Sequence, residues 1–464
     1  MEQNELLRSI PQANTVLEHP DILAFGRDLS HDILLRDVRA ALDDIRKSIL
    51  SGQRTTEATV AEVASVASGR LSARLRPFHY RVINATGIIL NTSLGRAPLP
   101  SSVAKHISDG IAGYMRLAAH PKTGRRYDRD ILVGQLFAEI TGGEAATFCN
   151  NNAAATYLVL SALAAGKEVI VSRGQLVEIG GQFRIPDVLA ASGAKLVEVG
   201  TTNRTHLKDY RKAITERTGV ILRVHTSNYR ITGFASTPSI GELSQLAHEN
   251  NLLCIDDIGS GQLVDFGQLG IPNDYPLSES IGAGADIVCF SGDKLMGGVQ
   301  AGIIIGKAAL IEKIRSHPLA RAFRCGKMTV LGLEGMARLY MNPQRARKEI
   351  PALAMLATPL AELKKTAGRI AKHLRASYEV KESEDETYVG GGSLPDVNLR
   401  TYTLQIARKG MSAEELAEAL RAADPPVFAR VAEDHVILDL RTLLAGEEKL
   451  LIKALLAIPK KENG

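Results

Sequence analysis

The sequence predicts an α/β protein: a large domain with a mainly parallel sheet, a smaller C-terminal α+β domain and an N-terminal helical module. Residues 1–69 show an apolar period of three to four, whereas short apolar runs separated by helix-length segments follow from residue 81. Beyond residue 330 a long helical stretch precedes two strand-like segments. We therefore expect a helical module at 1–69, a linker at 70–80, and domains at 81–330 and 331–464.

The helical module contains one clear amphipathic helix. After Ser30, a suitable N-cap, apolar residues recur three to four apart until Gly52, a residue type that commonly ends helices. Thr59 and Glu62 have the spacing of a capping box. A second helix is therefore expected to begin there and to end near Gly69.

The large domain is expected to contain buried strands, each a short run of mostly apolar residues. The runs are 146–149, 168–172, 195–199, 220–224, 252–256, 286–290 and 302–306. Continuous apolar runs are typical of parallel strands that helices cover on both faces. Ligands of such sheets bind beyond the carboxyl ends of the strands, so the residues that follow each run are the candidates for a site.

The C-terminal domain reads as helical up to about residue 377. Strand-like segments follow at 402–406 and 435–440, and a last helix is expected at 445–458. Between the helical stretch and the first of these segments lies the loop that contains glycines 390–392.

Composition excludes several classes of protein. The 464 residues carry 56 Lys and Arg against 51 Asp and Glu, a net charge of +5, and no basic or acidic tail. No run approaches the roughly 18 apolar residues that a membrane helix needs, so we expect a cytoplasmic protein without a membrane partner. The four cysteines lack metal-ligand spacing, and we expect no metal site and no disulfide.

Residues after three of the runs together match the needs of pyridoxal phosphate. Asn151, Asn152 and Ala153 open a helix, whose N-terminus offers N–H groups to a phosphate. Asp257 follows another run and can hold a pyridine nitrogen protonated, which makes the ring an electron sink. Lys294 follows a third run and can form a Schiff base. The order of phosphate loop, acid and lysine matches the fold-type-I pyridoxal-phosphate enzymes.

Longer motifs make the resemblance closer than a fold. They lie at 84–97, 150–155, 172–181, 183–187, 200–205, 224–229, 291–295 and 317–321. With these motifs the chain resembles bacterial selenocysteine synthase, the L-seryl-tRNA(Sec) selenium transferase family, over essentially its whole length. The resemblance implies a fold-type-I transferase that uses pyridoxal 5′-phosphate.

The resemblance also implies a reaction. Seryl-tRNA(Sec) becomes selenocysteinyl-tRNA(Sec) when β-elimination of the serine hydroxyl gives an aminoacrylate, to which selenium from selenophosphate adds. Lys294 is then both the Schiff-base lysine and a proton shuttle. Asp293 is expected to orient this lysine or to polarise the leaving hydroxyl, although a purely structural turn role is the alternative.

Further site residues follow from the same resemblance. Arg96, Arg321 and Arg324 match the family's anion-binding arginines and are expected beside Lys294; the alternative for the last two is a surface helix face paired with acids. Ser291 is a candidate phosphate ligand. His225 is a candidate to stack on the cofactor or to contact substrate, unless it is an ordinary core histidine.

The resemblance extends to partners. It implies that the helical module grips the selenocysteine tRNA, where Arg36, Arg39 and Arg46 are candidates for contact or simply solvate a polar helix face. It also implies a homo-oligomer, a decamer built as a pentamer of dimers.

Three segments depart from the family pattern, and two other functions stay open. Residues 118–126 are basic where the family has an acidic segment, and Cys325 and Gly326 replace an apolar residue and an aspartate. Residues 399–401 read Leu-Arg-Thr where the family tends to have Leu-Pro followed by Ser or Thr. Cys325 is either an activated thiol or a small packing residue. The first alternative function is a related lyase or aminotransferase acting on a small amino sugar or amino acid. The second is a tRNA-binding or assembly protein without cofactor.

Overall fold

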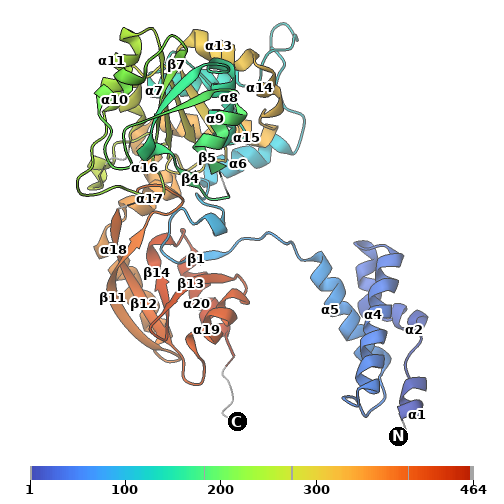
Figure 1. Ribbon diagram of the computed structural model, residues 1–464. Coiled ribbons are helices and arrows are strands. Elements are labelled where there is room, and N and C mark those ends of the chain that lie inside the picture. The colour runs from blue at the N-terminus through green and yellow to red at the C-terminus, as the bar shows by residue number, and fades with distance from the viewer. Residues whose placement is uncertain (1–2, 182, 273–274, 396, 460–464) are drawn as a thin grey trace. The chain divides into compact units, whose positions relative to one another are not determined.

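In the computed structural model, residues 3–181, 183–272, 275–395 and 397–459 are described (Figure 1). The chain divides into two compact units, Met1–Arg81 and Val82–Gly464, and the first has an apolar core of its own. Among the described residues, none of the helices combines the length and hydropathy needed to cross a bilayer.

The first unit is a small bundle of helices. They are α1 (Gln3–Arg8), α2 (Ala13–Leu17), α3 (Pro20–Leu23), α4 (His31–Leu50) and α5 (Val60–Leu75). The helix predicted after Ser30 is confirmed as α4, which buries Leu34, Val38 and Ile45 in the core of the unit. The predicted capping box is also present, because the Glu62 carboxylate accepts from the Thr59 N–H at 2.8 Å and the Thr59 hydroxyl accepts from the Glu62 N–H.

Helix α5 is longer than predicted. It continues through Gly69 to Leu75, so the first half of the predicted linker at 70–80 is helical. The fully buried Leu71 explains the difference, since it extends the apolar face of the helix by one turn beyond Ala67. On the same helix Arg74 donates to the buried carboxylate of Asp37 at 2.7 Å.

The second unit contains a seven-stranded sheet in the order β2-β10-β9-β8-β7-β3-β6. Its strands are β2 (Ala145–Cys149), β3 (Glu168–Ser172), β6 (Lys195–Val199), β7 (Thr218–Val224), β8 (Leu253–Gly259), β9 (Ile287–Ser291) and β10 (Gly302–Gly306). Each of the seven predicted runs is one of these strands. Only β10 runs antiparallel to its neighbours, β2 and β9, so the predicted mainly parallel sheet is confirmed.

Helices cover both faces of this sheet (Figure 1). They are α6 (Ser101–Ile111), α7 (Ile131–Thr141), α8 (Asn152–Leu163), α9 (Ile185–Ala191), α10 (Leu207–Ala213), α11 (Ile240–Glu249), α12 (Leu277–Gly282), α13 (Ala308–Ser316), α14 (Pro318–Ala322), α15 (Lys327–Tyr340), α16 (Pro343–Glu349) and α17 (Pro351–Ala357). Alternate residues of one strand belong to different cores: Ile303 and Ile305 pack with α7 and α15, and Ile304 packs with α8 and α13. Burial on both faces explains why the strands are continuous apolar runs. The short strands β4 (Glu178–Ile179) and β5 (Phe183–Arg184) form a separate hairpin.

A second sheet has the order β1-β13-β14-β12-β11 and forms the smaller domain. Its elements are β1 (Ile83–Ala85), β11 (Glu379–Tyr388), β12 (Asn398–Ala407), β13 (Val427–Ala432), β14 (His435–Asp439), α18 (Leu360–Leu374), α19 (Ala413–Arg421) and α20 (Glu447–Ala457). Because β1 pairs with β13, the chain enters this unit through the small sheet.

The predicted boundaries at 81 and 331 therefore need correction. Residues 83–85 belong to the small sheet, although the sequence placed them in the large domain. Helices α15 to α17 bury Leu333, Met336 and Leu353 in the core of the large sheet, so the small domain resumes only with α18. The continuous helical pattern after residue 330 hid this change of partner, because helices on either side of the boundary have similar apolar faces.

Candidate active site

Lys294 lies in the tight loop between β9 and β10, at the carboxyl edge of the large sheet. The Leu295 N–H donates to the carbonyl of Ser260, and the Gly297 N–H donates to the carbonyl of Lys294, so the loop is held from both sides. The lysine is only 7% exposed. Burial lowers the pKa of its ammonium group, and the nearby guanidinium of Arg96 lowers it further, against the acids Asp257 and Asp293. A neutral amine is therefore favoured, which is the nucleophilic form of a lysine.

Asp257 lies on β8, immediately before a β-bulge that shifts the pairing with β9. Its carboxylate accepts hydrogen bonds from Asn152 Nδ2 at 2.8 Å, Thr156 Oγ1 at 2.7 Å and the Gly259 N–H at 3.1 Å. Burial raises the pKa of this carboxyl, and the bonds from Thr156 and Asn152 act in the opposite direction. The result is a buried acid held in one orientation, 5% exposed, close to Lys294.

The phosphate loop predicted at Asn151, Asn152 and Ala153 forms the start of α8. Asn151 is the N-cap, and its Oδ1 accepts from the Ala154 N–H at 2.9 Å. The side chain of Asn152 points to Asp257, as described above. The first N–H groups of α8, including that of Ala153, are free of the Asn151 cap, and a contact of this loop with phosphate stays a prediction.

Asp293 joins Lys294 to two other predicted residues. Its Oδ2 accepts from Arg96 Nη1 at 2.8 Å, and its Oδ1 accepts from Ser291 Oγ at 2.8 Å. Ser291 thus orients Asp293, and a contact between its hydroxyl and a phosphate stays a prediction. Arg96 is part-exposed, and Asp293 is the single partner of its guanidinium among the described residues. The remaining N–H groups of this guanidinium can receive an oxyanion.

His225 lies at the end of β7, beside Asp257. Its backbone N–H donates to the backbone carbonyl of Asp257 at 2.9 Å, and its imidazole ring contacts the ring of Tyr275 with centroids 4.5 Å apart. The ring is almost fully buried. The structure therefore brings His225 to the same edge of the sheet as Asp257, and its contact with cofactor or substrate stays a prediction.

Arg321 and Arg324 follow α13 and line a cavity of their own. This cavity has a volume of about 170 Å³, and its described lining residues include Arg126 and Arg129 but neither Lys294 nor Arg96. The structure brings Arg96 beside Lys294, and the gathering of Arg321 and Arg324 at the same site stays a prediction. Arg324 follows Phe323, whose carbonyl accepts from the Asn150 N–H at 3.0 Å, so this part of the chain lies against the residues that precede α8.

Residues of two segments that depart from the family pattern, Ala118, Arg126 and Cys325, line the same cavity. Arg126 and Arg129, from the basic segment and the residues after it, add to its positive charge. Burial and the charges of Arg324, Arg126 and Arg321 lower the pKa of Arg129, whose Nη1 donates to the carbonyl of Cys325 at 2.9 Å. Burial raises the pKa of the Cys325 thiol to about 12, so Cys325 is a packing residue rather than an activated thiol.

Sequence reasoning missed Thr156 as a site residue. Thr156 lies four residues after Asn152 on α8, and both side chains reach Asp257 because that spacing puts them on one face of a helix. The spacing is visible in the sequence, but the apolar helix around Thr156 makes the residue read as core.

The donor set fits pyridoxal phosphate. Three buried oxygens at this edge, Asn152 Oδ1, Ser227 Oγ and Ser260 Oγ, have no hydrogen-bond partner among the described residues. Buried polar atoms in proteins are normally satisfied, so these indicate a bound polar group. A helix N-terminus, a buried acid, hydroxyl groups and a lysine of lowered pKa match the phosphate, ring nitrogen, ring hydroxyl and aldehyde of this cofactor.

The fold has a solved counterpart. A structure of D-glucosaminate-6-phosphate ammonia-lyase matches 81% of this chain and 95% of its own with a TM-score of 0.57, at 21% sequence identity. The fold and the site together define a fold-type-I enzyme that depends on pyridoxal phosphate, which confirms the predicted fold class and cofactor.

The particular family follows from sequence comparison. The model of the L-seryl-tRNA selenium transferase family matches residues 82–444. The L-seryl-tRNA(Sec) selenium transferase of Carboxydothermus hydrogenoformans is 44% identical over 96% of both chains, and that of Solidesulfovibrio magneticus is 45% identical over 97% of both. The chain belongs to the L-seryl-tRNA selenium transferase family.

Proposed function

We propose that this enzyme converts seryl-tRNA(Sec) to selenocysteinyl-tRNA(Sec). The observation that carries the proposal is the buried Lys294 amine between Asp257 and the Asp293–Arg96 ion pair, in a chain of this family. Both alternatives are less well supported. The named relatives of nearly full length are transferases at 44–45% identity, whereas the ammonia-lyase shares 21%. A protein without cofactor would leave the buried oxygens of Asn152, Ser227 and Ser260 without a partner at this edge of the sheet.

Pyridoxal phosphate, when bound, supplies an electron sink for the serine Cα. Lys294 would hold the cofactor through Nζ, and the same amine would take the Cα proton, a role that its lowered pKa favours. Asp257 holds a proton at the ring nitrogen, and Asn152 and Thr156 keep that carboxylate oriented. Asp293 stands beside the lysine, where it polarises the departing serine hydroxyl.

We propose selenophosphate as the selenium donor. Arg96 offers its remaining N–H groups next to Lys294. Arg321 and Arg324 line a cavity in which Arg126 and Arg129 add positive charge, an environment that favours a multiply charged oxyanion.

We also propose that the enzyme works as a homo-oligomer, a decamer built as a pentamer of dimers. Arg321 and Arg324 line a cavity whose described lining does not include Arg96, which supports a site to which a second copy contributes residues. Light scattering that gives a monomer for the active protein contradicts this proposal.

The first unit is proposed to bind the body of tRNA(Sec). Arg36 and Arg39 are exposed on α4, and Arg46 pairs with Asp43 on the same helix. Equal gel-shift affinity for tRNA(Sec) and bulk tRNA would contradict this role of the first unit.

We place the reaction in the cytoplasm, where aminoacyl-tRNA is made and used.

The test of the function is direct. Purified protein with pyridoxal phosphate, seryl-tRNA(Sec) and selenophosphate is expected to release selenocysteine after deacylation. Lys294→Ala is expected to lose the visible absorbance band of the lysine-bound cofactor and about 100-fold or more of the rate. Lys313→Ala on the exposed face of α13 is the matched control and keeps both. Release of unchanged serine by the wild-type protein refutes the proposal, and turnover of a free amino acid or amino sugar in place of seryl-tRNA(Sec) supports the lyase or aminotransferase alternative.

A further inference from the structure

A chain of hydrogen bonds leads from the small sheet to the active-site arginine. It begins at Thr442, just after β14, whose Oγ1 donates to the carbonyl of Asn84 at 2.7 Å and accepts from the Gly87 N–H at 3.2 Å. Asp439, the last residue of β14, lies under the same turn: it forms a β-bridge with Thr86, and a Cβ on Gly87 would lie 2.1 Å from Asp439 Oδ2. Residues 84–87 are thus fitted closely onto the end of β14.

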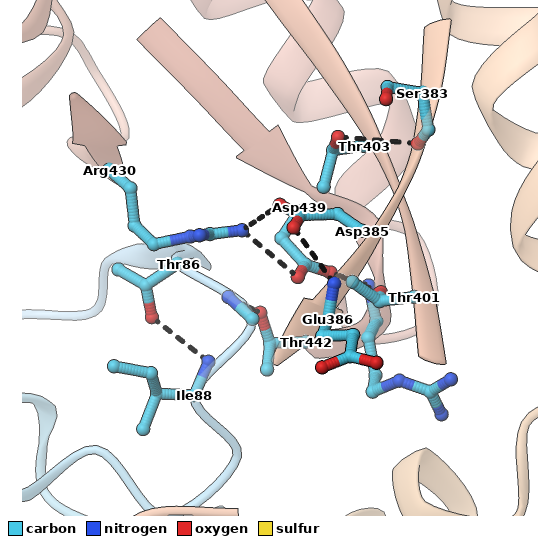
Figure 2. A network of polar contacts seen from close by, with 12 residues as sticks. Thr86, Ile88, Ser383, Asp385, Glu386, Thr401, Thr403, Arg430, Asp439 and Thr442 are labelled. Carbon is cyan, nitrogen blue, oxygen red and sulfur yellow. Dashed lines mark hydrogen bonds and ion pairs between the residues drawn. The ribbon is translucent and has the colours of Figure 1, made fainter. Parts of the chain in front are cut away.

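The end of β14 is itself rigid. Asp439 is fully buried, and its Oδ1 accepts from Thr401 Oγ1 at 2.7 Å and from the Arg441 N–H at 3.1 Å. Figure 2 shows Arg430 beside this carboxylate, with its guanidinium 3.7 Å from Oδ2, and also bonded to Asp385 at 2.8 Å. Fixed groups of three strands, β12, β13 and β14, therefore surround the turn.

Thr86 is the junction of the path toward the site. Its Oγ1 donates to Asn84 Oδ1 at 2.7 Å and accepts from the Ile88 N–H at 3.2 Å, a contact visible in Figure 2, and from Asn91 Nδ2 at 3.4 Å. One hydroxyl thus ties the turn at Asn84 to Asn91. Thr86 is buried, so water does not easily replace these hydrogen bonds.

From Asn91 the path reaches the active site in one step. The carbonyl of Asn91 accepts from the Arg96 N–H at 2.9 Å, and Arg96 Nη1 donates to Asp293 at 2.8 Å, next to Lys294. Arg96 has a positive φ of 62°, which is unfavourable for a residue with a Cβ and persists where the surroundings hold it. The segment from Asn84 to Arg96 thus keeps a strained backbone in place.

We infer that Thr86 is a positioning residue for Arg96. Its hydroxyl transmits the fixed position of the β14 end, through Asn84 and Asn91, to the guanidinium that meets Asp293 and the selenium donor. The inference rests on the proposed function for the role of Arg96 toward the donor. It assigns a purpose to most of the motif at 84–97, of which the proposed reaction uses only the arginine.

Thr86→Val tests the inference because it keeps the shape of the side chain and removes the hydroxyl. We expect the KM for selenophosphate to rise about ten-fold while the KM for seryl-tRNA(Sec) stays as in the wild type. Thr86→Ser restores the hydroxyl and is expected to restore the donor KM to within about three-fold. Thr403→Val is the matched control: it removes a buried threonine hydroxyl from the same sheet, bonded to the Ser383 carbonyl at 3.3 Å, on no path to Arg96.

A second measurement needs no substrate. The guanidinium of Arg96 lowers the pKa at Lys294, whose other charged neighbours are Asp257 and Asp293. If Thr86→Val displaces Arg96, the visible band of the lysine-bound cofactor titrates at a higher pH than in the wild type and in Thr403→Val. Should Thr86→Val fail to fold, Asn91→Ser removes the amide donor to Thr86 and keeps an N-cap for residues 92–94, and it is expected to act in the same direction.

The outcomes separate the two proposals. An inactive wild-type protein refutes the proposed function, while the cofactor titration still tests the positioning role. If the wild type is active and Thr86→Val matches Thr403→Val in both donor KM and titration, Thr86 is only structural and the inference is wrong. Failure of Thr86→Ser to recover either quantity also overturns it.

Discussion

The hydrogen bond from Thr156 to Asp257 offers the sharpest test of the cofactor site. Thr156→Val removes the 2.7 Å bond to a buried carboxylate and preserves the volume of the side chain. A hydrogen bond to a charged group contributes about 1.5–3 kcal/mol, and one pKa unit corresponds to about 1.4 kcal/mol. The pKa of Asp257, already raised by burial, is therefore expected to rise further in this variant.

The assay is the affinity for pyridoxal phosphate as a function of pH, followed by the absorbance of the bound cofactor. Only the ionised carboxylate stabilises a protonated ring nitrogen, so a raised pKa removes the binding form of Asp257 at low pH and spares it at high pH. The variant is expected to bind about 10- to 150-fold more weakly at the acidic end and to approach the wild type as pH rises.

A matched control separates this effect from general loss of packing. Thr147→Val also removes a buried hydroxyl bonded to a carboxylate, here Asp130, away from Asp257. It is expected to leave the pH dependence of cofactor binding unchanged. A deficit in Thr156→Val that is independent of pH, or that grows toward high pH, refutes the reasoning.

Three further outcomes are expected. Gly87→Ala puts a Cβ against Asp439 at a φ of +83° and is expected to lower the free energy of unfolding by about 3 kcal/mol or more. Gly368→Ala, on the open side of α18, is expected to be neutral or slightly stabilising. Urea unfolding of both variants checks this, and equal midpoints contradict it. Asp37→Asn is expected to lower the stability of the first unit at pH 7 but not at acid pH. Arg74 holds the pKa of Asp37 below 3.8, so the stabilisation exists above that pH and vanishes as pH falls through the lowered value. Hydrogen exchange of α4 along a pH series measures this stability, and a deficit that persists in acid argues against the ion pair. Cys325, with its pKa raised to about 12, is expected to resist alkylation of the native protein at pH 8, and rapid labelling seen by mass spectrometry would show an activated thiol instead.

The strands of the large sheet can be predicted from the sequence because each strand's own residues carry the signal. A strand buried on both faces must be apolar at every position, so β3, β6 and β10 appear in the sequence with their observed bounds. The carboxyl ends of neighbouring parallel strands meet at one edge of the sheet, which is why the sequence alone is enough to pair Asp257, near the end of β8, with Lys294, just after β9.

The small sheet shows where the same reasoning fails. Strand β11 reads EVKESEDETY, a polar segment with no strand signal of its own. It is a strand because ten of its residues pair with β12, from Glu379 with Ala407 to Tyr388 with Asn398. Long-range pairing, and not local propensity, decides such an edge strand.

The contact between Gly87 and Thr442 joins residues 355 positions apart, and β1 needs β13 as its partner. Such non-local contacts are slow to form, because a long intervening chain must be ordered before they contribute any stability. During synthesis the segment that carries Arg96 emerges early, yet the residues that hold this segment in the folded protein lie near 427–442. The active site of a nascent chain is therefore completed only after nearly all of the chain has left the ribosome, and a premature stop before this region leaves the arginine without its anchor.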